Sequence, residues 1–166
     1  MKDQFYYVRW MTEPDMEQVY EIELACFKDN RWTKHDFSAA LRKGIGLVAI
    51  GFGGELVGFT IYNMEPQRYE LLTLAAKYPR LGIGTALVTH LRNKLSPYRR
   101  IKIEAMVRET NLSAQLFFKS VGFKAVKVKK DTYFDTDEDG YLMQCLLEGC
   151  QDVEKEEVYE EENHFS

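Results

Sequence analysis

Residues 80–85, Arg-Leu-Gly-Ile-Gly-Thr, are the feature that most constrains the fold of this chain. They follow a short apolar run and open an amphipathic stretch that ends near Leu95. Two glycines two positions apart allow a tight turn, in which several backbone N–H groups at a helix start face one anion. A plain strand-to-helix turn can have the same sequence, so a turn without a ligand is the alternative at this point.

The length and composition predict a single globular domain. The chain has 166 residues, of which 45% are hydrophobic and 13% aromatic, and this is enough to build a substantial core. Uninterrupted apolar runs are far shorter than the roughly 18 residues that a membrane-spanning helix needs, and the first residues contain no apolar signal core. We therefore expect a cytoplasmic protein without a membrane partner.

Neither the cysteines nor the acidic segment late in the chain predicts a metal site. Cys26, Cys145 and Cys150 are an odd number without the spacing of zinc ligands or of a disulfide framework, so we expect reduced thiols. The alternating aspartates within residues 135–139 resemble part of a calcium loop, but the glutamate ligand is missing at the right offset. An exposed turn is therefore predicted for this segment.

The net charge of −4 is unevenly distributed along the chain. Residues 148–166 hold eight acidic residues and one lysine, whereas the rest of the chain has 21 basic and 18 acidic residues. We therefore expect a folded domain over residues 1–147, suited to an anionic ligand, and a disordered acidic tail over residues 148–166. Lysines recur along residues 124–130 without stacking aromatic residues between them, so nucleic acid is not an expected partner.

Apolar periodicity and turn residues predict mixed helices and strands without an internal repeat. Thr33 is expected to cap a helix through Asp36, and Gly53-Gly54 is expected to join two strands as a hairpin. A polar loop is expected at residues 135–140. Strands are expected at residues 5–10, 47–52, 56–62, 69–75, 100–107, 123–130 and 141–147, and helices at residues 16–24, 33–41, 82–95 and 113–120.

Four segments in this order resemble the signature of the GCN5-related N-acetyltransferase (GNAT) superfamily. That signature is a strand, the loop Q/R-x-x-G-x-G/A, a helix, another strand, and then Asn-x-x-Ala with an aromatic residue and a closing Gly-Phe. The corresponding segments here are residues 71–76, 79–84, 101–107 and 111–123. The resemblance covers about residues 5–147, and residues 27–33 are similar to the entry region of ribosomal-protein N-terminal alanine acetyltransferases.

The resemblance implies an α/β (α+β) fold, with a mixed, mostly antiparallel central sheet of six or seven strands flanked by about four helices. It also implies that acetyl-CoA is the acyl donor, without a metal, and that a primary amine attacks the thioester directly in a ternary complex. Backbone N–H groups of residues 81–85 would bind the coenzyme A pyrophosphate at the positive end of a helix. The strand before them would leave backbone groups of residues 74–76 free for the pantetheine arm.

Asn111 matches the residue whose side chain contacts the pantetheine in the family, although an ordinary helix cap would also explain it. Phe118 would lie along the cofactor, and core packing is the alternative. The residues to which the resemblance gives a cofactor-binding role are Leu74, Ala75, Ala76, Arg80, Leu81, Gly82, Ile83, Gly84, Thr85, Asn111 and Phe118.

The chain departs from the family pattern at positions that matter for chemistry. Pro79 stands where the loop usually has Gln or Arg, and the loop is shorter than usual, so we expect Arg80 to take over part of the contact. Met106 and Phe118 stand where the alanine acetyltransferases often have a glutamate base and a tyrosine acid. Other residues, or water, must therefore move the protons.

Three residues are candidates for proton transfer. Glu104 lies on the same strand and face as Met106 and could act through a water, or it is one charge of a solvated face. Glu70, at the start of the strand before the glycines, is the second candidate base. Tyr133 matches a region where relatives place substrate-binding or catalytic tyrosines, or it is a half-buried strand residue. Nothing near the cysteines in sequence supports a covalent acetyl-cysteine.

The acidic loop at residues 135–139, together with Glu65 and Glu70, favours a cationic acceptor such as a protein N-terminus, a lysine or a polyamine. A non-catalytic acyl-CoA-binding module of the same fold is the alternative, because the usual glutamate and tyrosine are missing. An enzyme that uses a different acyl-CoA is a further alternative. A homodimer is compatible with the sequence, which does not specify the oligomeric state.

Overall fold

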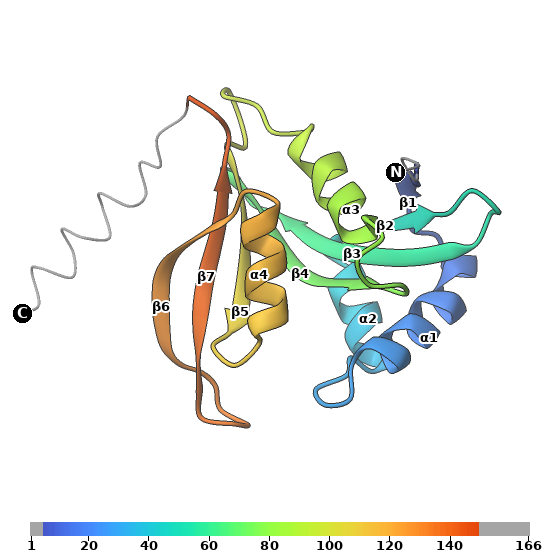
Figure 1. Cartoon of the computed structure of the whole chain (residues 1–166), viewed down its shortest axis with the longest axis horizontal. Coiled ribbons are helices and arrows are strands. Elements are labelled where there is room, and N and C mark those ends of the chain that lie inside the picture. Colours follow the sequence, from blue (N-terminus) through green and yellow to red (C-terminus); the bar gives the residue numbers. More distant parts are fainter. Residues whose placement is uncertain (1–4, 150–166) are drawn as a thin grey trace, which may run out of the picture.

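One sheet runs through residues 5–149, the part of the chain that the computed structural model describes, and helices cover both of its faces (Figure 1). Its strands lie in the order β1-β2-β3-β4-β5-β7-β6. The strands are β1 (Tyr7–Trp10), β2 (Ile45–Ile50), β3 (Leu56–Met64), β4 (Arg68–Ala76), β5 (Lys102–Arg108), β6 (Lys124–Tyr133) and β7 (Glu138–Leu146). The helices are α1 (Met16–Cys26), α2 (Lys34–Leu41), α3 (Ile83–Arg92) and α4 (Leu112–Ser120), and the short 3-10 turn η1 (Glu13–Asp15) precedes α1. This arrangement confirms the predicted fold class.

Strands β4 and β5 form the one parallel pair of the described sheet, and they pair over only part of their length. The ladder joins Arg68–Leu71 to Lys102–Ala105 and ends there. On the other side of β4, the register against β3 shifts at Tyr62, which leaves Leu72 as a bulge. Because a bulge bends the strand that carries it, the end of β4 from Leu72 onward separates from β5, and its backbone groups on that side lack a strand partner.

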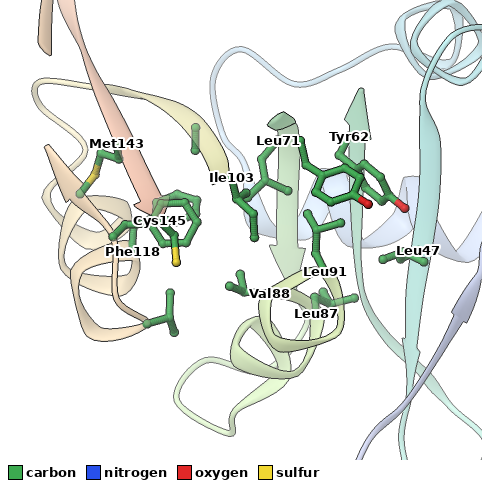
Figure 2. Close-up of a cluster of buried hydrophobic side chains, with 14 of the residues drawn as sticks. Leu47, Tyr62, Leu71, Leu87, Val88, Leu91, Ile103, Phe118, Met143 and Cys145 are labelled. Carbon is green, nitrogen blue, oxygen red and sulfur yellow. The ribbon is translucent and has the colours of Figure 1, made fainter. Parts of the chain in front are cut away.

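The two faces of the sheet bury two separate hydrophobic clusters. Alternation along β2 places Leu47 and Ala49 in one cluster and Val48 in the other. The larger cluster packs α3 and α4 against one face, and Figure 2 shows side chains from both helices meeting those of β4, β5 and β7. The smaller cluster packs α1 and α2 against the opposite face around the fully buried Phe37. The open backbone of β4 thus lies between two layers of helices.

Polar side chains fix the starts of two N-terminal elements. The predicted cap of α2 is confirmed, because the Asp36 N–H donates to Thr33 Oγ1 over 3.1 Å and the Thr33 N–H donates to Asp36 Oδ2 over 2.7 Å. In η1, the buried Asp15 accepts hydrogen bonds from Arg9 over 2.7 and 2.9 Å and from the Thr12 N–H over 2.8 Å. These contacts join the end of β1 to the helical layer beside it.

Element boundaries differ from the prediction at two places. The polar loop predicted for residues 135–140 is shorter, because β7 already begins at Glu138, where the Asp139 carboxylate accepts from the Asp131 N–H and from Lys130. Helix α3 ends at Arg92 rather than near Leu95, since the chain continues in tight turns there. The elements themselves occur where they were expected.

No helix among residues 5–149 combines the length and apolarity needed to cross a membrane. Cys26 and Cys145 are free thiols. Cys150 and the acidic segment from residue 150 to residue 166 lie outside the described residues.

Candidate active site

The loop between β4 and α3 turns through two left-handed residues. Arg80 has a φ of 60° and Gly82, the N-cap of α3, has a φ of 79°. The first hydrogen bond of the helix runs from the Ala86 N–H to the Gly82 carbonyl over 3.0 Å, so the N–H groups before Ala86 have no acceptor within the helix. Tyr6 donates from its hydroxyl to the Leu81 carbonyl over 2.7 Å and anchors the loop to the N-terminal segment. An anion at residues 81–85, which we call the cradle, would find N–H groups without helical acceptors here.

The two glycines of this cradle have different surroundings. A Cβ on Gly82 would meet no atom within 4 Å, so this glycine serves the backbone conformation alone. A Cβ on Gly84 would lie 2.9 Å from the ring of Phe117, so this glycine allows α3 to pack closely against α4. The exposed Arg80 has neither a hydrogen bond nor an ion pair among residues 5–149, which leaves its guanidinium available to an anion.

Leu74, Ala75 and Ala76 lie in the part of β4 that β5 does not pair. The Leu74 side chain packs on the larger cluster and that of Ala75 belongs to the smaller one. The Ala76 carbonyl accepts from the Cys26 thiol over 3.2 Å, so this carbonyl is already engaged. Burial raises the pKa of that thiol, which disfavours the nucleophilic thiolate.

Asn111 and Phe118 make the contacts expected of a helix cap and of a core residue, respectively. Asn111 is the N-cap of α4, and its Oδ1 accepts from the Ala114 N–H over 3.1 Å. Phe118 is 7% exposed and packs against the rings of Phe117 and Phe123. Both contacts exist without a ligand, so a role in cofactor binding would come in addition to a role in the fold.

The two candidate bases lie directly opposite one another on neighbouring strands but differ in their partners. Glu70 on β4 and Glu104 on β5 are paired in register, one step before the ladder ends. The Glu104 carboxylate forms ion pairs with Lys102 at 3.3 Å and with Arg68 at 3.4 Å, and accepts a hydrogen bond from Gln144 at 3.3 Å. Within residues 5–149, Glu70 has no such partner. The geometry therefore favours a structural role for Glu104 and leaves Glu70 as the uncommitted carboxylate.

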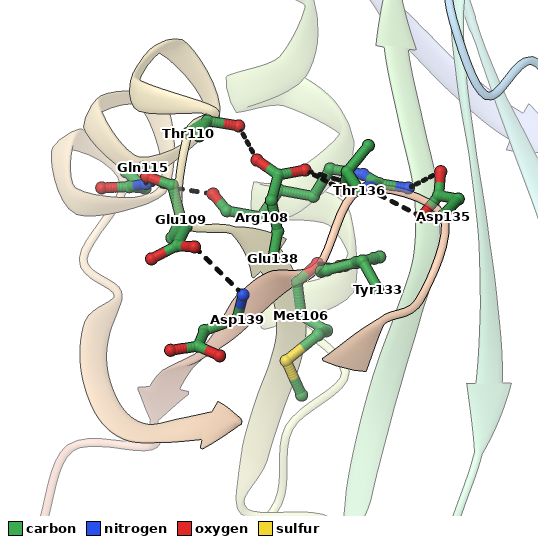
Figure 3. A network of polar contacts seen from close by, with 10 residues as sticks. All are labelled: Met106, Arg108, Glu109, Thr110, Gln115, Tyr133, Asp135, Thr136, Glu138 and Asp139. Carbon is green, nitrogen blue, oxygen red and sulfur yellow. Dashed lines mark hydrogen bonds and ion pairs between the residues drawn. The ribbon is translucent and has the colours of Figure 1, made fainter. Parts of the chain in front are cut away.

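A polar network at the end of β5 joins this strand to the turn between β6 and β7 (Figure 3). The Arg108 guanidinium lies 3.9 Å from the ring centroid of Tyr133 and forms ion pairs with Asp135 at 3.2 Å and Glu138 at 3.0 Å. Hydrogen bonds donated by Thr110 and Thr136, followed by the contact with Arg108, lower the pKa of Glu138. We call Arg108, Tyr133, Asp135 and Glu138 the Arg108 network.

Tyr133 is half-buried, as one of its two interpretations predicts, and it lies close to Met106. Its hydroxyl donates to the Met106 carbonyl over 3.4 Å, and burial raises its pKa. The phenol therefore stays protonated at neutral pH and can donate a proton but not accept one. The Met106 side chain packs against Gly140. A Cβ added to Gly140 would lie 2.6 Å from the Met106 sulfur. The thioether thus occupies the space over Gly140, while the Met106 carbonyl contacts Tyr133.

Arg108 and Asn30 are two residues of this region that the sequence analysis did not select. With its amide oriented to satisfy both neighbours, Asn30 donates to Asp135 at 2.7 Å and accepts from Arg108 at 3.3 Å. This contact joins the loop between α1 and α2 to the turn between β6 and β7. A charge at the end of an expected strand was the only signal for Arg108. Asn30 lies within residues 27–33, which resemble the family's entry region, but its contacts could not be predicted because its partners are far away in sequence.

Comparisons with known proteins agree with this geometry. The model of the acetyltransferase (GNAT) domain family matches residues 12–135. An N-alpha-acetyltransferase of Sulfolobus acidocaldarius is 26% identical over 158 residues, which cover 86% of this chain and 93% of the relative. The ribosomal protein bS18-alanine N-acetyltransferase of Escherichia coli is 29% identical over 133 residues, which cover 78% of this chain and 89% of the relative.

Solved structures share the fold. The crystal structure of the Escherichia coli enzyme superposes with a TM-score of 0.75 at 21% identity, over 90% of this chain and 98% of that one. A GNAT family acetyltransferase from Elizabethkingia anophelis with acetyl-CoA bound superposes with a TM-score of 0.70 at 16% identity, over 89% of this chain and 100% of that one.

Proposed function

Because the chain belongs to the GNAT acetyltransferase family and is thus an enzyme that transfers acetyl groups from acetyl-CoA, we propose that its acceptor is the α-amine of a protein N-terminus. Two relatives support this acceptor, since one is an N-alpha-acetyltransferase and the other a ribosomal protein alanine N-acetyltransferase. The shared region is most of the chain, 86% in one case and 78% in the other.

The proposal rests on what lies on either side of the point where β4 and β5 stop pairing. On one side of this place, β4 leads with unpaired backbone into the cradle at Gly82, so a coenzyme bound there can lay its arm along the strand. On the other side, the Arg108 network carries two carboxylates and one guanidinium and is therefore net negative. Negative charge beside the thioester attracts a cationic amine.

We assign the proton transfers to the groups that the geometry leaves available. Glu70 takes a proton from the acceptor ammonium, directly or through water, and the neutral nitrogen then attacks the thioester carbonyl carbon. A C–N bond forms and the C–S bond breaks, and the nitrogen loses its second proton. In this assignment the Tyr133 phenol gives a proton to the departing thiolate and regains one from solvent. The products are the N-acetyl amide, free coenzyme A and one proton.

Two matched substitutions test the assignment of the base. Glu70→Gln should lower kcat by about 10²-fold or more, with part of the rate regained at higher pH, where more of the amine is neutral. Glu104→Gln removes the same charge at the same register and should leave kcat within about threefold, because its carboxylate serves an ion cluster. The measurement is thiol release with a peptide that has a free N-terminus. An equal loss in both variants, or a larger loss in Glu104→Gln, contradicts the assignment of Glu70.

The acceptor itself is tested with two peptides of one sequence. In the first the N-terminus is free and every lysine is acetylated, and in the second the N-terminus is blocked and the lysines are free. We expect acetylation of the first peptide only, located by mass spectrometry of the product. Acetylation of the second peptide alone would assign a lysine acceptor, and binding of acetyl-CoA without turnover of either would support the non-catalytic alternative.

A further inference from the structure

A groove with a volume of about 1240 Å³ lies between α1 and α2. The ends of β1 and η1, Gly44 and the start of β2 also line it. Because β2, β3 and β4 run antiparallel in succession, the start of β2 lies at the end of the sheet where β4 begins. The cradle follows the other end of β4, so the α1–α2 groove and the coenzyme cradle lie at opposite ends of the sheet.

Apolar side chains line this groove along its whole length. Met16 and Tyr20 come from α1, Leu41 from the end of α2 and Ile45 from the start of β2. Trp10 stands at the edge with 69% of its surface exposed. Apolar side chains that line a groove and are bordered by charges are one arrangement found at interaction sites.

The two walls of the groove carry opposite charges. The α1 wall, extended by η1, presents Glu13, Glu17 and Glu21, four positions apart and exposed, and none of them forms an ion pair within residues 5–149. The α2 wall presents Lys34 and Arg42. The acidic wall is therefore not neutralised by the basic wall beside it.

Two contacts fix the order of these charges along the groove. At one end the Lys34 ammonium lies 5.4 Å from the ring centroid of Tyr20, next to Glu21 in sequence. At the other end the Met11 N–H donates to the Gly46 carbonyl over 2.9 Å. Glu13 and Arg42 therefore belong to the same end of the groove.

We propose that a second copy of this chain covers the α1–α2 groove, in a two-fold symmetric dimer with α1 of each copy over α2 of the other. A two-fold contact is self-complementary, so the same surface must match itself. Stacking α1 on α1 would set glutamates against glutamates, whereas stacking α1 on α2 sets Glu13 against Arg42 and Glu21 against Lys34. Only the second arrangement pairs opposite charges while it buries the apolar lining. This inference goes beyond the proposed function, since it concerns assembly and needs no acetyl transfer for its test.

Charge exchange between copies tests the dimer. Sedimentation velocity of the full chain should show a dimer, and two variants should each raise its dissociation constant by about 10²-fold or more, because like charges then face each other. One variant carries Glu13→Lys with Glu21→Lys, and the other carries Lys34→Glu with Arg42→Glu. An equimolar mixture of the two should form a heterodimer, since each introduced lysine then faces an introduced glutamate. Restoration in the mixture also shows that both variants are folded.

Lys124→Glu with Lys129→Glu is the matched control, because it reverses two exposed charges on β6, far from the groove in the strand order. It should leave the dissociation constant within about threefold of that of the unaltered chain. A monomer at about 100 μM, a mixture of the two groove variants that stays monomeric, or a control that dissociates the dimer as strongly as they do would each overturn the proposal.

Discussion

The two glycines of the proposed coenzyme cradle, Gly82 and Gly84, have different physical roles. Gly82 supplies a φ of 79° in open surroundings, and only its backbone conformation demands glycine. Gly84 has helical geometry, and its missing side chain makes room for the ring of Phe117. Removing the first glycine should therefore disturb the cradle, and removing the second should disturb the packing of two helices.

Alanine at each position separates these tasks. Gly82→Ala should cost about 1 kcal/mol of stability and weaken acetyl-CoA binding about tenfold or more, because the turn that aims the N–H groups is strained. Gly84→Ala should cost about 1–3 kcal/mol through overpacking against Phe117, with a smaller effect on binding. Urea unfolding and calorimetric titration with acetyl-CoA measure both quantities. The opposite ranking in either measurement would contradict this division of tasks.

Sequence alone predicted the glycine turn at residues 80–85 but not which of the two candidate carboxylates has partners in the fold. Glu70 and Glu104 are both glutamates on strands of similar pattern, and nothing local distinguishes them. Their difference arises from Arg68, Lys102 and Gln144, which the sheet brings to Glu104 from three strands. Which partners a side chain meets depends on the order of the strands in the sheet. The apolar periodicity of a single strand does not predict that order.

At the scale of elements, a buried ion pair holds the first strand to the helical layer. Asp15 is 5% exposed, and the hydrogen bonds from Arg9, followed by those from Thr12, lower its pKa to about 2. A carboxyl whose pKa is lowered in the folded state contributes stability above its unfolded pKa, and this contribution disappears as the pH falls through the folded value. Stability from Asp15 is therefore complete at neutral pH and declines between about pH 4 and pH 2.

Asp15→Asn tests this contribution. The free energy of unfolding at pH 7 should fall by about 2 kcal/mol, the equivalent of the lowered pKa. The difference between the variant and the unaltered chain should shrink as the pH is lowered from 4 towards 2. Urea unfolding at a series of pH values measures it. Asp36→Asn is a useful comparison, because the same capping arrangement is solvent-exposed there and should contribute less. A difference for Asp15→Asn that does not change with pH would contradict the ion-pair explanation.

The elements that sequence predicted well are those with local causes. The capping residues at Thr33 and Asp36 and the glycines between β2 and β3 act within a few positions, so their effect is visible in the sequence. The extension of β6 and β7 past the predicted loop depends instead on Asp139, which satisfies groups of the opposite strand. The bulge at Leu72 likewise appears only once β3 and β4 are paired.

At the scale of the whole molecule, the proposed acceptor site is assembled from segments that are distant in sequence. Asn30 follows α1, Arg108 ends β5 and Asp135 follows β6, and the fold brings them into one set of contacts. Most coenzyme-binding residues that the family resemblance implies fall within residues 74–85, with Asn111 and Phe118 apart from them. On the acceptor side the sequence pointed to residues 27–33, Tyr133 and the acidic loop at residues 135–139, but not to their contacts with Arg108, because loops vary most among relatives and these contacts are long-range.

Asn30 is the residue through which this assembly can be tested. Asn30→Ala removes the contacts with Asp135 and Arg108, so the loop between α1 and α2 loses a link to the turn between β6 and β7. We expect the KM for an N-terminal peptide to rise about three- to tenfold, because a loop that must be ordered on binding costs free energy. The KM for acetyl-CoA should stay within about twofold, since the cradle lies on another loop.

Asn93→Ala, an exposed asparagine at the end of α3, is the matched control and should change neither KM. Steady-state kinetics with each substrate varied in turn distinguishes the outcomes. If Asn30→Ala raised both KM values equally, the loop would serve the fold as a whole. If Asn30→Ala changed neither KM, acceptor binding would not depend on this link. The contact between the two loops would then lie outside the path of the incoming N-terminus.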